Sequence, residues 1–154
     1  MLCARLRPAN QDAAAGSAEE VGRIVAQLRQ RWPEVKIVLR ADSGFCREAL
    51  MAWCEQNHVD YVFGLARNQR LRRIIGKQMH QAHLEHQSTG NAARVFAEFD
   101  YQTHNSWSRS RRVVAKAEYL DKGENPRFVV TSLSAEQWAA QQLYEKFYCA
   151  RGEM

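Results

Sequence analysis

In the first part of the chain, the hydrophobic pattern switches repeatedly between the period of a strand and that of a helix. Apolar residues that alternate or run continuously predict strands at Leu2–Arg7, Val35–Leu39 and Val59–Leu65. One helix is predicted from Ser17 until Pro33 ends it, with an apolar face of Val21, Ile24, Val25 and Leu28. A second is predicted at Cys46–Asn57, with Leu50, Trp53 and Cys54 buried. The order β-α-β-α-β is typical of an α/β sheet with parallel strands.

After this unit the pattern gives one basic helix and then an antiparallel β unit. The helix is predicted at Arg70–His86, with Leu71, Ile74, Ile75 and Met79 as its apolar stripe, and a loop follows at residues 87–91. Strands are predicted at Ala93–Tyr101, Arg111–Leu120 and Arg127–Leu133, the last two joined by a turn.

Two capping boxes mark expected helix starts. Ser17 pairs with Glu20, and Ser134 pairs with Gln137, the spacing at which a serine and a polar residue satisfy each other's backbone N–H groups. The second box is expected to open a helix that runs to the end of the chain.

Composition narrows the class of protein. The chain has 154 residues, of which 45% are hydrophobic and 25% charged, as in one soluble globular domain. No apolar run is long enough for a membrane helix and the start does not resemble a leader, so we expect a cytoplasmic protein. The four cysteines form no C-x-x-C pair, which disfavours a zinc site. A formal net charge of +5 makes a polyanionic partner plausible.

Asp42 is the first candidate for chemistry. It follows the predicted strand at Val35–Leu39 and precedes Ser43 and Gly44, a turn small enough for a ligand to approach. A carboxylate at the end of a strand in an α/β sheet can bind a metal ion or flank a phosphate site. The alternative is a helix cap or turn former.

Aromatic and basic residues give further candidates. Trp107 stands among serines and arginines, including Arg111 and Arg112, at the tip of the β unit. This combination fits base stacking with phosphate contact, and the alternative is a Trp folded back on the sheet. On the last helix, Tyr144, Tyr148 and Arg151 share one stripe, where the alternative is a core aromatic with a solvated arginine.

Taken together, these stretches resemble the DDE transposases of bacterial insertion sequences, in the group with a Tyr-Arg-Glu-Lys signature on the last catalytic helix. The resemblance rests on residues 6–10, 39–45, 61–68, Ser106-Trp107 with 111–116, and 147–152, which occur in the family's order. It implies an α/β fold with an incomplete RNase H-like core, that is, a mixed sheet with flanking helices. The resemblance also implies an antiparallel β insertion before the last helix.

The resemblance also implies a chemistry. Two Asp and one Glu of the family hold two Mg²⁺ ions that promote DNA strand cleavage and transfer. Asp42 matches the second Asp, and Tyr148 and Arg151 match residues that position DNA phosphate; Trp107, Arg111, Arg112 and Asn68 are further candidate DNA contacts. Residues 1–154 would be a partial catalytic domain, with core elements at 1–86 and 134–154 and the insertion at 87–133.

The first Asp and the Glu of the family would fall outside the sequence. We therefore expect an internal fragment of a transposase, inactive alone, whose parent acts on transposon DNA ends. The alternative is a non-catalytic remnant that binds DNA, or that associates with itself or with full-length transposase and inhibits it. A generic α/β domain with incidental basic charge is the remaining possibility.

Overall fold

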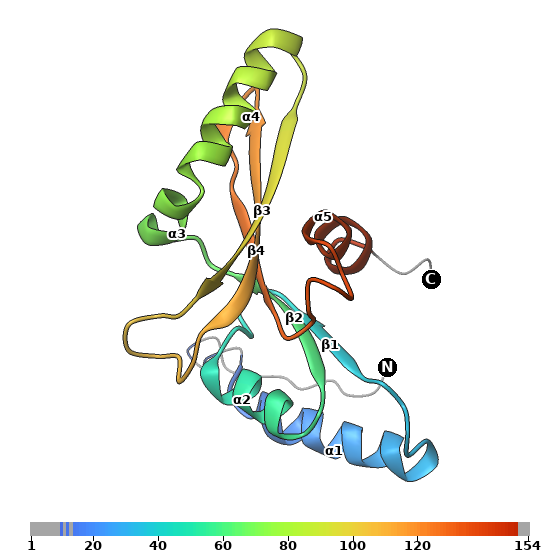
Figure 1. Ribbon diagram of the computed structural model, residues 1–154. Helices are drawn as coiled ribbons and strands as arrows, with labels where there is room; N and C mark the ends of the chain where they lie inside the picture. The colour runs from blue at the N-terminus through green and yellow to red at the C-terminus, as the bar shows by residue number, and fades with distance from the viewer. Residues whose placement is uncertain (1–9, 11, 13, 151–154) are drawn as a thin grey trace.

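The computed structural model describes residues 10, 12 and 14–150, which form a mixed sheet with helices on both faces (Figure 1). The helices are α1 (Ser17–Arg31), α2 (Glu48–Gln56), α3 (Gln69–Ile74), α4 (Gly76–Thr89), α5 (Ala140–Gln142) and the π-helical η1 (Leu143–Tyr148). The strands are β1 (Val38–Ala41), β2 (Asp60–Leu65), β3 (Ala93–Tyr101), β4 (Arg111–Leu120), β5 (Gly123–Glu124) and β6 (Arg127–Thr131). The predicted strand at Leu2–Arg7 and the candidate Arg151 lie outside the described residues.

All six strands belong to one sheet, in the order β1-β2-β6-β4-β3, with β5 paired to β4. β1 and β2 are parallel, with Ala41 opposite Phe63. The other pairs are antiparallel. This arrangement confirms the predicted fold class: an α/β chain with a mixed sheet, and an antiparallel β unit before the last helix. The strands of that unit continue the sheet begun by β1 and β2, so the boundaries of a separate insertion stay a prediction.

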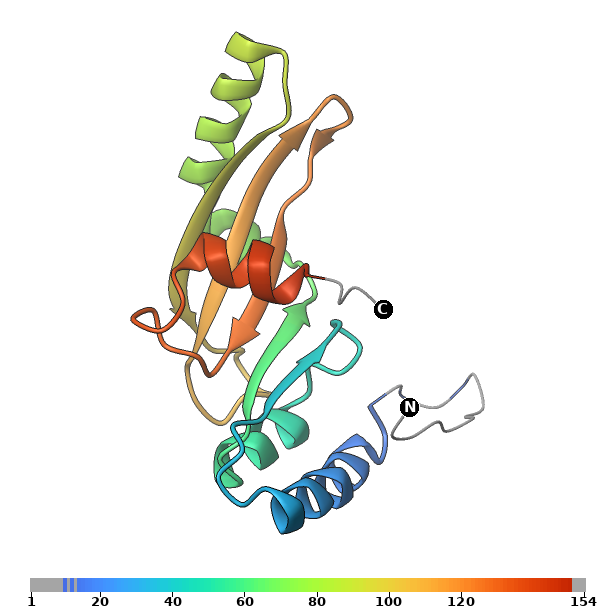
Figure 2. The same ribbon diagram turned by 90° about the vertical axis from the view of Figure 1, so that its right-hand side faces the viewer.

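The two faces of the sheet bury different side chains because successive residues of a strand point to opposite sides. Tyr61, Phe63, Val113 and Val130 pack with residues of α1 to α4 in one apolar cluster. Their neighbours Val62, Val114 and Val129 pack with Leu143 and Tyr144 of η1 in a second cluster. Figure 2 shows α5 and η1 lying across the strands on this second face. The alternation predicted from sequence therefore sets which helices cover which face.

The N-terminal elements differ in detail from the predictions. Gly16, with φ of 69°, precedes α1, and no side chain caps the helix, so the predicted capping box of Ser17 and Glu20 is wrong. Glycine adopts this left-handed conformation at little cost, which lets Ser17 already belong to the helix. β1 is also shorter than the predicted strand: Val35 is 38% exposed and pairing begins at Val38.

The basic helix is divided in two. α3 ends at Ile74 and α4 begins at Gly76, and α4 continues through most of the predicted loop at residues 87–91. Leu71, Ile75 and Met79 are buried as expected, but Ile74 is 42% exposed. The interruption at Ile75 changes which side chains share a face, so a stripe drawn for one continuous helix assigns Ile74 wrongly.

The C-terminal helix begins later than predicted. Ser134 N–H donates to Gln137 Oε1 at 3.2 Å and Gln137 N–H donates to Ser134 Oγ at 3.3 Å. The capping box thus forms, but it closes a turn, and helical structure starts at Ala140. Residues 143–148 then wind as a π-helix, in which Cys149 N–H donates to Tyr144 O at 2.9 Å. Within the described residues, no helix is both long and apolar enough to cross a membrane.

Candidate catalytic cleft

The strand end at Asp42 is the centre of the candidate site. Asp42 follows β1 directly and is exposed. Its Oδ1 accepts the Gly44 N–H at 2.8 Å, and its carbonyl accepts the Phe45 N–H at 3.2 Å. The carboxylate therefore stabilises the turn that leads toward α2, as the capping alternative expected. Oδ2 accepts no hydrogen bond from another described residue, which leaves it available to a ligand.

Gly64 brings β2 close to this turn and to η1. A Cβ at Gly64 would lie 2.5 Å from the Tyr148 hydroxyl oxygen and 2.9 Å from the Ser43 nitrogen. Gly64 follows Val62 by two residues, so it faces the same side of the sheet as η1. The absent side chain makes room for the Tyr148 hydroxyl beside the Asp42 turn. The structure thus brings together two site residues that are far apart in the sequence.

A cleft of about 430 Å³ opens at this point, lined by Arg40, Ala41, Asp42, Tyr148, Cys149 and Ala150. Arg40 faces the η1 side of β1, two residues before Asp42. Its Nη1 donates to the carbonyl oxygens of Phe147 at 3.1 Å and Tyr148 at 3.4 Å, and also to that of Ala150. These bonds attach the end of η1 to the strand that carries Asp42.

The Tyr148 phenol stays protonated near neutral pH. Burial raises its pKa first, and the neighbouring Cys149 thiol and Asp42 carboxylate raise it further, while Arg127 and Arg40 act in the opposite direction. A neutral phenol beside the cleft can donate a hydrogen bond to an anionic oxygen. The chemistry of this position suits a phosphate group next to Asp42.

A pair of divalent metal ions would need more ligands than the described part of the chain offers. No group of three or more His, Cys, Asp and Glu side chains among the described residues could hold a metal ion. Asp42 supplies one carboxylate, which is enough to help hold one Mg²⁺ ion together with waters and substrate phosphates but not to hold two. These residues alone do not make a two-metal site, and no reaction step follows from them.

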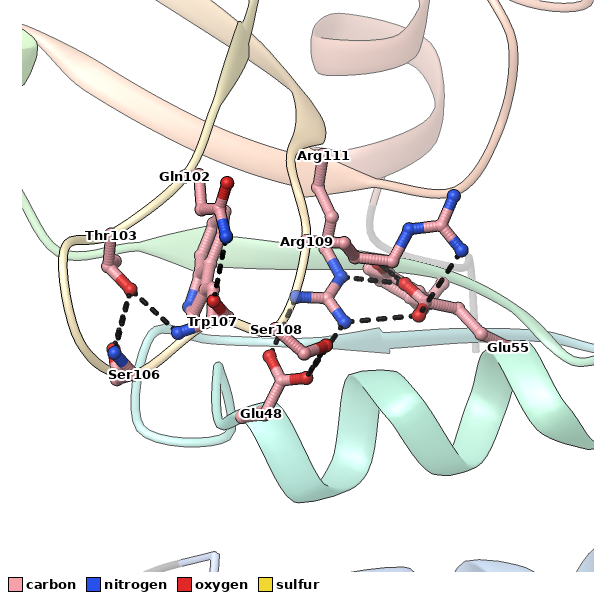
Figure 3. A network of polar contacts seen from close by, with 10 residues as sticks. Glu48, Glu55, Gln102, Thr103, Ser106, Trp107, Ser108, Arg109 and Arg111 are labelled. Carbon is pink, nitrogen blue, oxygen red and sulfur yellow. Dashed lines mark hydrogen bonds and ion pairs between the residues drawn. The ribbon is translucent and has the colours of Figure 1, made fainter.

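Trp107 and Arg111 lie in a buried network along α2, which contributes Glu48 from its first turn and Glu55 from its last (Figure 3). Trp107 is 7% exposed, packs edge-on against Tyr101 with ring centroids 5.7 Å apart, and donates its backbone N–H to Thr103 Oγ1 at 2.8 Å. The Arg111 guanidinium lies 5.5 Å from the Trp107 ring. For Trp107 the structure corresponds to the second alternative, a Trp folded back on the sheet.

Arg111 is 4% exposed and binds two carboxylates of α2. Its guanidinium donates to Glu55 at 2.6 and 3.0 Å and to Glu48 at 2.7 and 3.3 Å. Burial is the largest single influence and acts to raise the pKa values of both carboxyl groups, but hydrogen bonds from Arg111, Ser108 and Tyr61 together with the Arg111 charge outweigh it, and both pKa values fall below the usual range. Tyr61 also donates its hydroxyl to Glu55 at 2.8 Å. The network fixes the loop at residues 102–110 against α2.

Sequence reasoning missed this network, although the pattern contained a signal. On β4, Arg111 points to the same face of the sheet as the buried Val113, Ala115 and Ala117, because every second residue of a strand faces the same side. The alternation therefore predicts that Arg111 is buried. A buried arginine requires acidic partners. Glu48 and Glu55 provide them at a spacing of i and i+7 on one helix face.

The other candidates also have partners within the protein. Asn68 caps α3: its Oδ1 accepts the Leu71 N–H at 2.9 Å, and its Nδ2 donates to the Tyr101 hydroxyl at 3.2 Å. Arg112 pairs with Glu98 at 2.5 Å and donates to backbone carbonyls of the turn before α5. Both side chains therefore stabilise the fold where they stand.

The fold and the cleft define an α/β domain with a strand-end carboxylate beside a phenol. The sequence matches the family model described as "Transposase DDE domain group 1" over residues 1–154, and the chain belongs to this family of transposase DDE domains. A search of curated proteins found no match. Membership in this family implies DNA as the substrate and a transposition-related function.

Proposed function

We propose that this chain forms part of the catalytic domain of a DDE transposase, which cleaves DNA strands and transfers them with the help of Mg²⁺. The position of Asp42 is the observation that carries the proposal. Its free carboxylate oxygen stands at the carboxyl end of a parallel strand, in a cleft shared with Tyr148. Ligands of α/β sheets bind at this end of the strands.

In this proposal Asp42 is one of three carboxylates that hold two Mg²⁺ ions, and the remaining carboxylates come from outside the described residues. With all three carboxylates in place, such a site would supply activation of an attacking hydroxyl and stabilisation of the leaving oxygen of a phosphodiester. Tyr148 donates its hydroxyl to a DNA phosphate, and Arg151 contributes a bidentate contact. Gly64 keeps the space between β2 and η1 open for that hydroxyl.

The proposed organisation has RNase H-like core elements at residues 1–86 and 134–154 and an insertion at 87–133, and we propose a cytoplasmic location. DNA contacts by Trp107, Arg111, Arg112 and Asn68 stay predictions. Each of these side chains already has partners in the protein, so contact with DNA would require it to exchange them.

The test measures whether a divalent cation and DNA bind together at Asp42. Affinity for a short labelled duplex is measured by fluorescence anisotropy, with Mg²⁺ and with EDTA at matched ionic strength. We expect Mg²⁺ to strengthen binding by the wild type and by Asp121→Asn, an exposed control on the turn before β5, but not by Asp42→Asn. An equal effect of Mg²⁺ on Asp42→Asn and the control would refute the role of Asp42.

A second candidate function is a non-catalytic module that binds DNA, or that associates with full-length transposase and inhibits it. It is favoured by the presence of a single candidate metal carboxylate in the described part of the chain. A plasmid-nicking assay with Mg²⁺ separates the two. Nicking that disappears in Asp42→Asn supports catalysis, and absence of nicking together with inhibition of an active transposase of the family supports the module.

A further inference from the structure

The net positive charge of this chain arises from one segment. The chain has 22 Lys and Arg against 17 Asp and Glu. Between Asp60 and Glu85 there are five Lys and Arg and no acidic residue, so the rest of the chain carries 17 charges of each sign. The whole formal net charge of +5 therefore comes from this segment, which contains α3 and the first part of α4.

The segment includes most of β2 and the connection that carries Arg67, and its helices α3 and α4 lie on the face of the sheet opposite to the candidate cleft. Leu71, Ile75 and Met79 anchor α3 and α4 in the apolar cluster that also contains residues of α1 and α2. η1, which carries Tyr148, packs in the second cluster on the other face. Figure 1 shows α3 and α4 on one side of the strands and α5 on the other. A ligand on α3 and α4 would not occupy the Asp42 cleft.

The cations of the segment differ in whether they already have partners. Arg72 pairs with Glu124 at 2.5 Å, and Arg70 donates to the Gln102 carbonyl at 2.9 Å while stacking over Tyr101. Arg73 and Lys77 are exposed and have no ion-pair partner among the described residues. Glu124, the acidic residue near Arg73, is already paired with Arg72, so both cations are available to an anion.

A depression of about 470 Å³ in this surface is lined by Arg72, Arg73 and His80, among others. Gly76 also lines it, and a Cβ there would meet no atom within 4 Å, so the backbone is open. Glu124 is the acidic residue among its lining residues, and Arg72 neutralises it. The depression is thus concave, polar and positively charged.

We propose that α3 and α4 form a second DNA-binding surface, which binds backbone phosphates of a duplex independently of sequence. Lys and Arg that lack acidic partners attract the phosphate backbone and release its counterions on contact. Because this surface is separate from the Asp42 cleft, it holds a different stretch of DNA from the one that reacts. The proposal does not depend on Asp42 binding a metal ion.

The test measures the affinity of the chain for a short duplex of arbitrary sequence, by anisotropy in EDTA and across a series of salt concentrations. The test variant is Arg73→Gln/Lys77→Gln. The control, Arg31→Gln/Lys36→Gln, changes net charge equally but lies around the end of α1, with both residues exposed. All four side chains are exposed, and circular dichroism verifies that the variants fold.

Loss of two phosphate contacts is expected to make the slope of log K against log salt less negative by about 1.8. If the affinities are equal at 1 M salt, the variant then binds about 60-fold more weakly at 0.1 M salt. The control is expected to keep the wild-type slope. Equal slopes for the test variant and the control would overturn the proposal, because binding would then follow net charge alone. Absence of binding by the wild type at low salt would overturn it as well.

Discussion

Substitution of Gly64 by alanine gives the sharpest structural test of the cleft. The added Cβ would lie 2.5 Å from the Tyr148 hydroxyl oxygen, 2.9 Å from the Ser43 nitrogen and 3.2 Å from the Asp42 carbonyl carbon. The first contact is with the end of a side chain, which can move. The other two are with the backbone of the Asp42 turn, which is held by hydrogen bonds to Gly44 and Phe45.

The expected cost follows from these contacts. Overpacking of this kind costs about 1–3 kcal/mol, and the loss of glycine entropy from the unfolded chain offsets about 0.4–1 kcal/mol. We therefore expect Gly64→Ala to lower the free energy of unfolding by about 1–2 kcal/mol. Gly76→Ala is the matched control, because its Cβ meets no atom within 4 Å, and it should be neutral or stabilising.

The assay is urea denaturation of four variants: Gly64→Ala, Gly76→Ala, Tyr148→Phe and the double variant Gly64→Ala/Tyr148→Phe. Removing the hydroxyl relieves the closest contact and leaves the backbone contacts, so alanine at 64 should cost less in the Tyr148→Phe background, by about 0.5–1 kcal/mol. Two results would refute the reasoning. One is wild-type stability of Gly64→Ala, and the other is full additivity of the two substitutions.

The remaining predictions concern the buried groups. Arg111→Met leaves two partly buried glutamates of α2 without their cation, and urea denaturation should show a loss of about 2–4 kcal/mol, below the range for fully buried pairs. Because the pKa values of those glutamates are lowered in the folded state, their contribution is present above the unfolded-state pKa of 4.5 and is lost as pH falls through the folded-state values. Wild type should therefore lose more stability than Arg111→Met below about pH 5, and parallel curves would contradict this. Burial raises the pKa of Cys46 to about 11 and that of Cys54 to about 12. In a Cys3→Ser background at pH 8, an aromatic disulfide reagent should modify the exposed Cys149 rapidly, the partly buried Cys46 slowly, and the buried Cys54 only after unfolding; equal native rates for Cys54 and Cys149 would contradict this.

Much of the fold could be predicted from the sequence because local patterns determine it. Strands β3 and β4 have the predicted bounds, since β3 alternates over nine residues and β4 is a ten-residue run whose apolar side chains are buried on both faces of the sheet. Asp42 falls at a strand end because the apolar run before it and the Ser-Gly turn after it are both visible in the sequence. Family resemblance then assigns it a chemistry that the residues alone leave open.

The features that escaped prediction depend on distant contacts or on backbone conformation. The buried position of Arg111 requires two glutamates that lie more than fifty residues earlier in the chain. The proximity of Tyr148 to Asp42 depends on Gly64, which belongs to neither segment. The π-helical winding of η1 and the left-handed Gly16 change where a helix starts or which side chains it presents, without any change in hydrophobic period.

The most direct test of the central claim is Mn²⁺ titration of the isotope-labelled chain by NMR. Mn²⁺ replaces Mg²⁺ at carboxylate sites and broadens the signals of nearby nuclei. We predict that amide signals of Asp42, Ser43, Gly44 and Gly64 broaden first, and that Asp42→Asn abolishes this selective broadening while Asp121→Asn preserves it. Broadening that begins elsewhere, or that persists in Asp42→Asn, would contradict the assignment of Asp42 as a metal ligand.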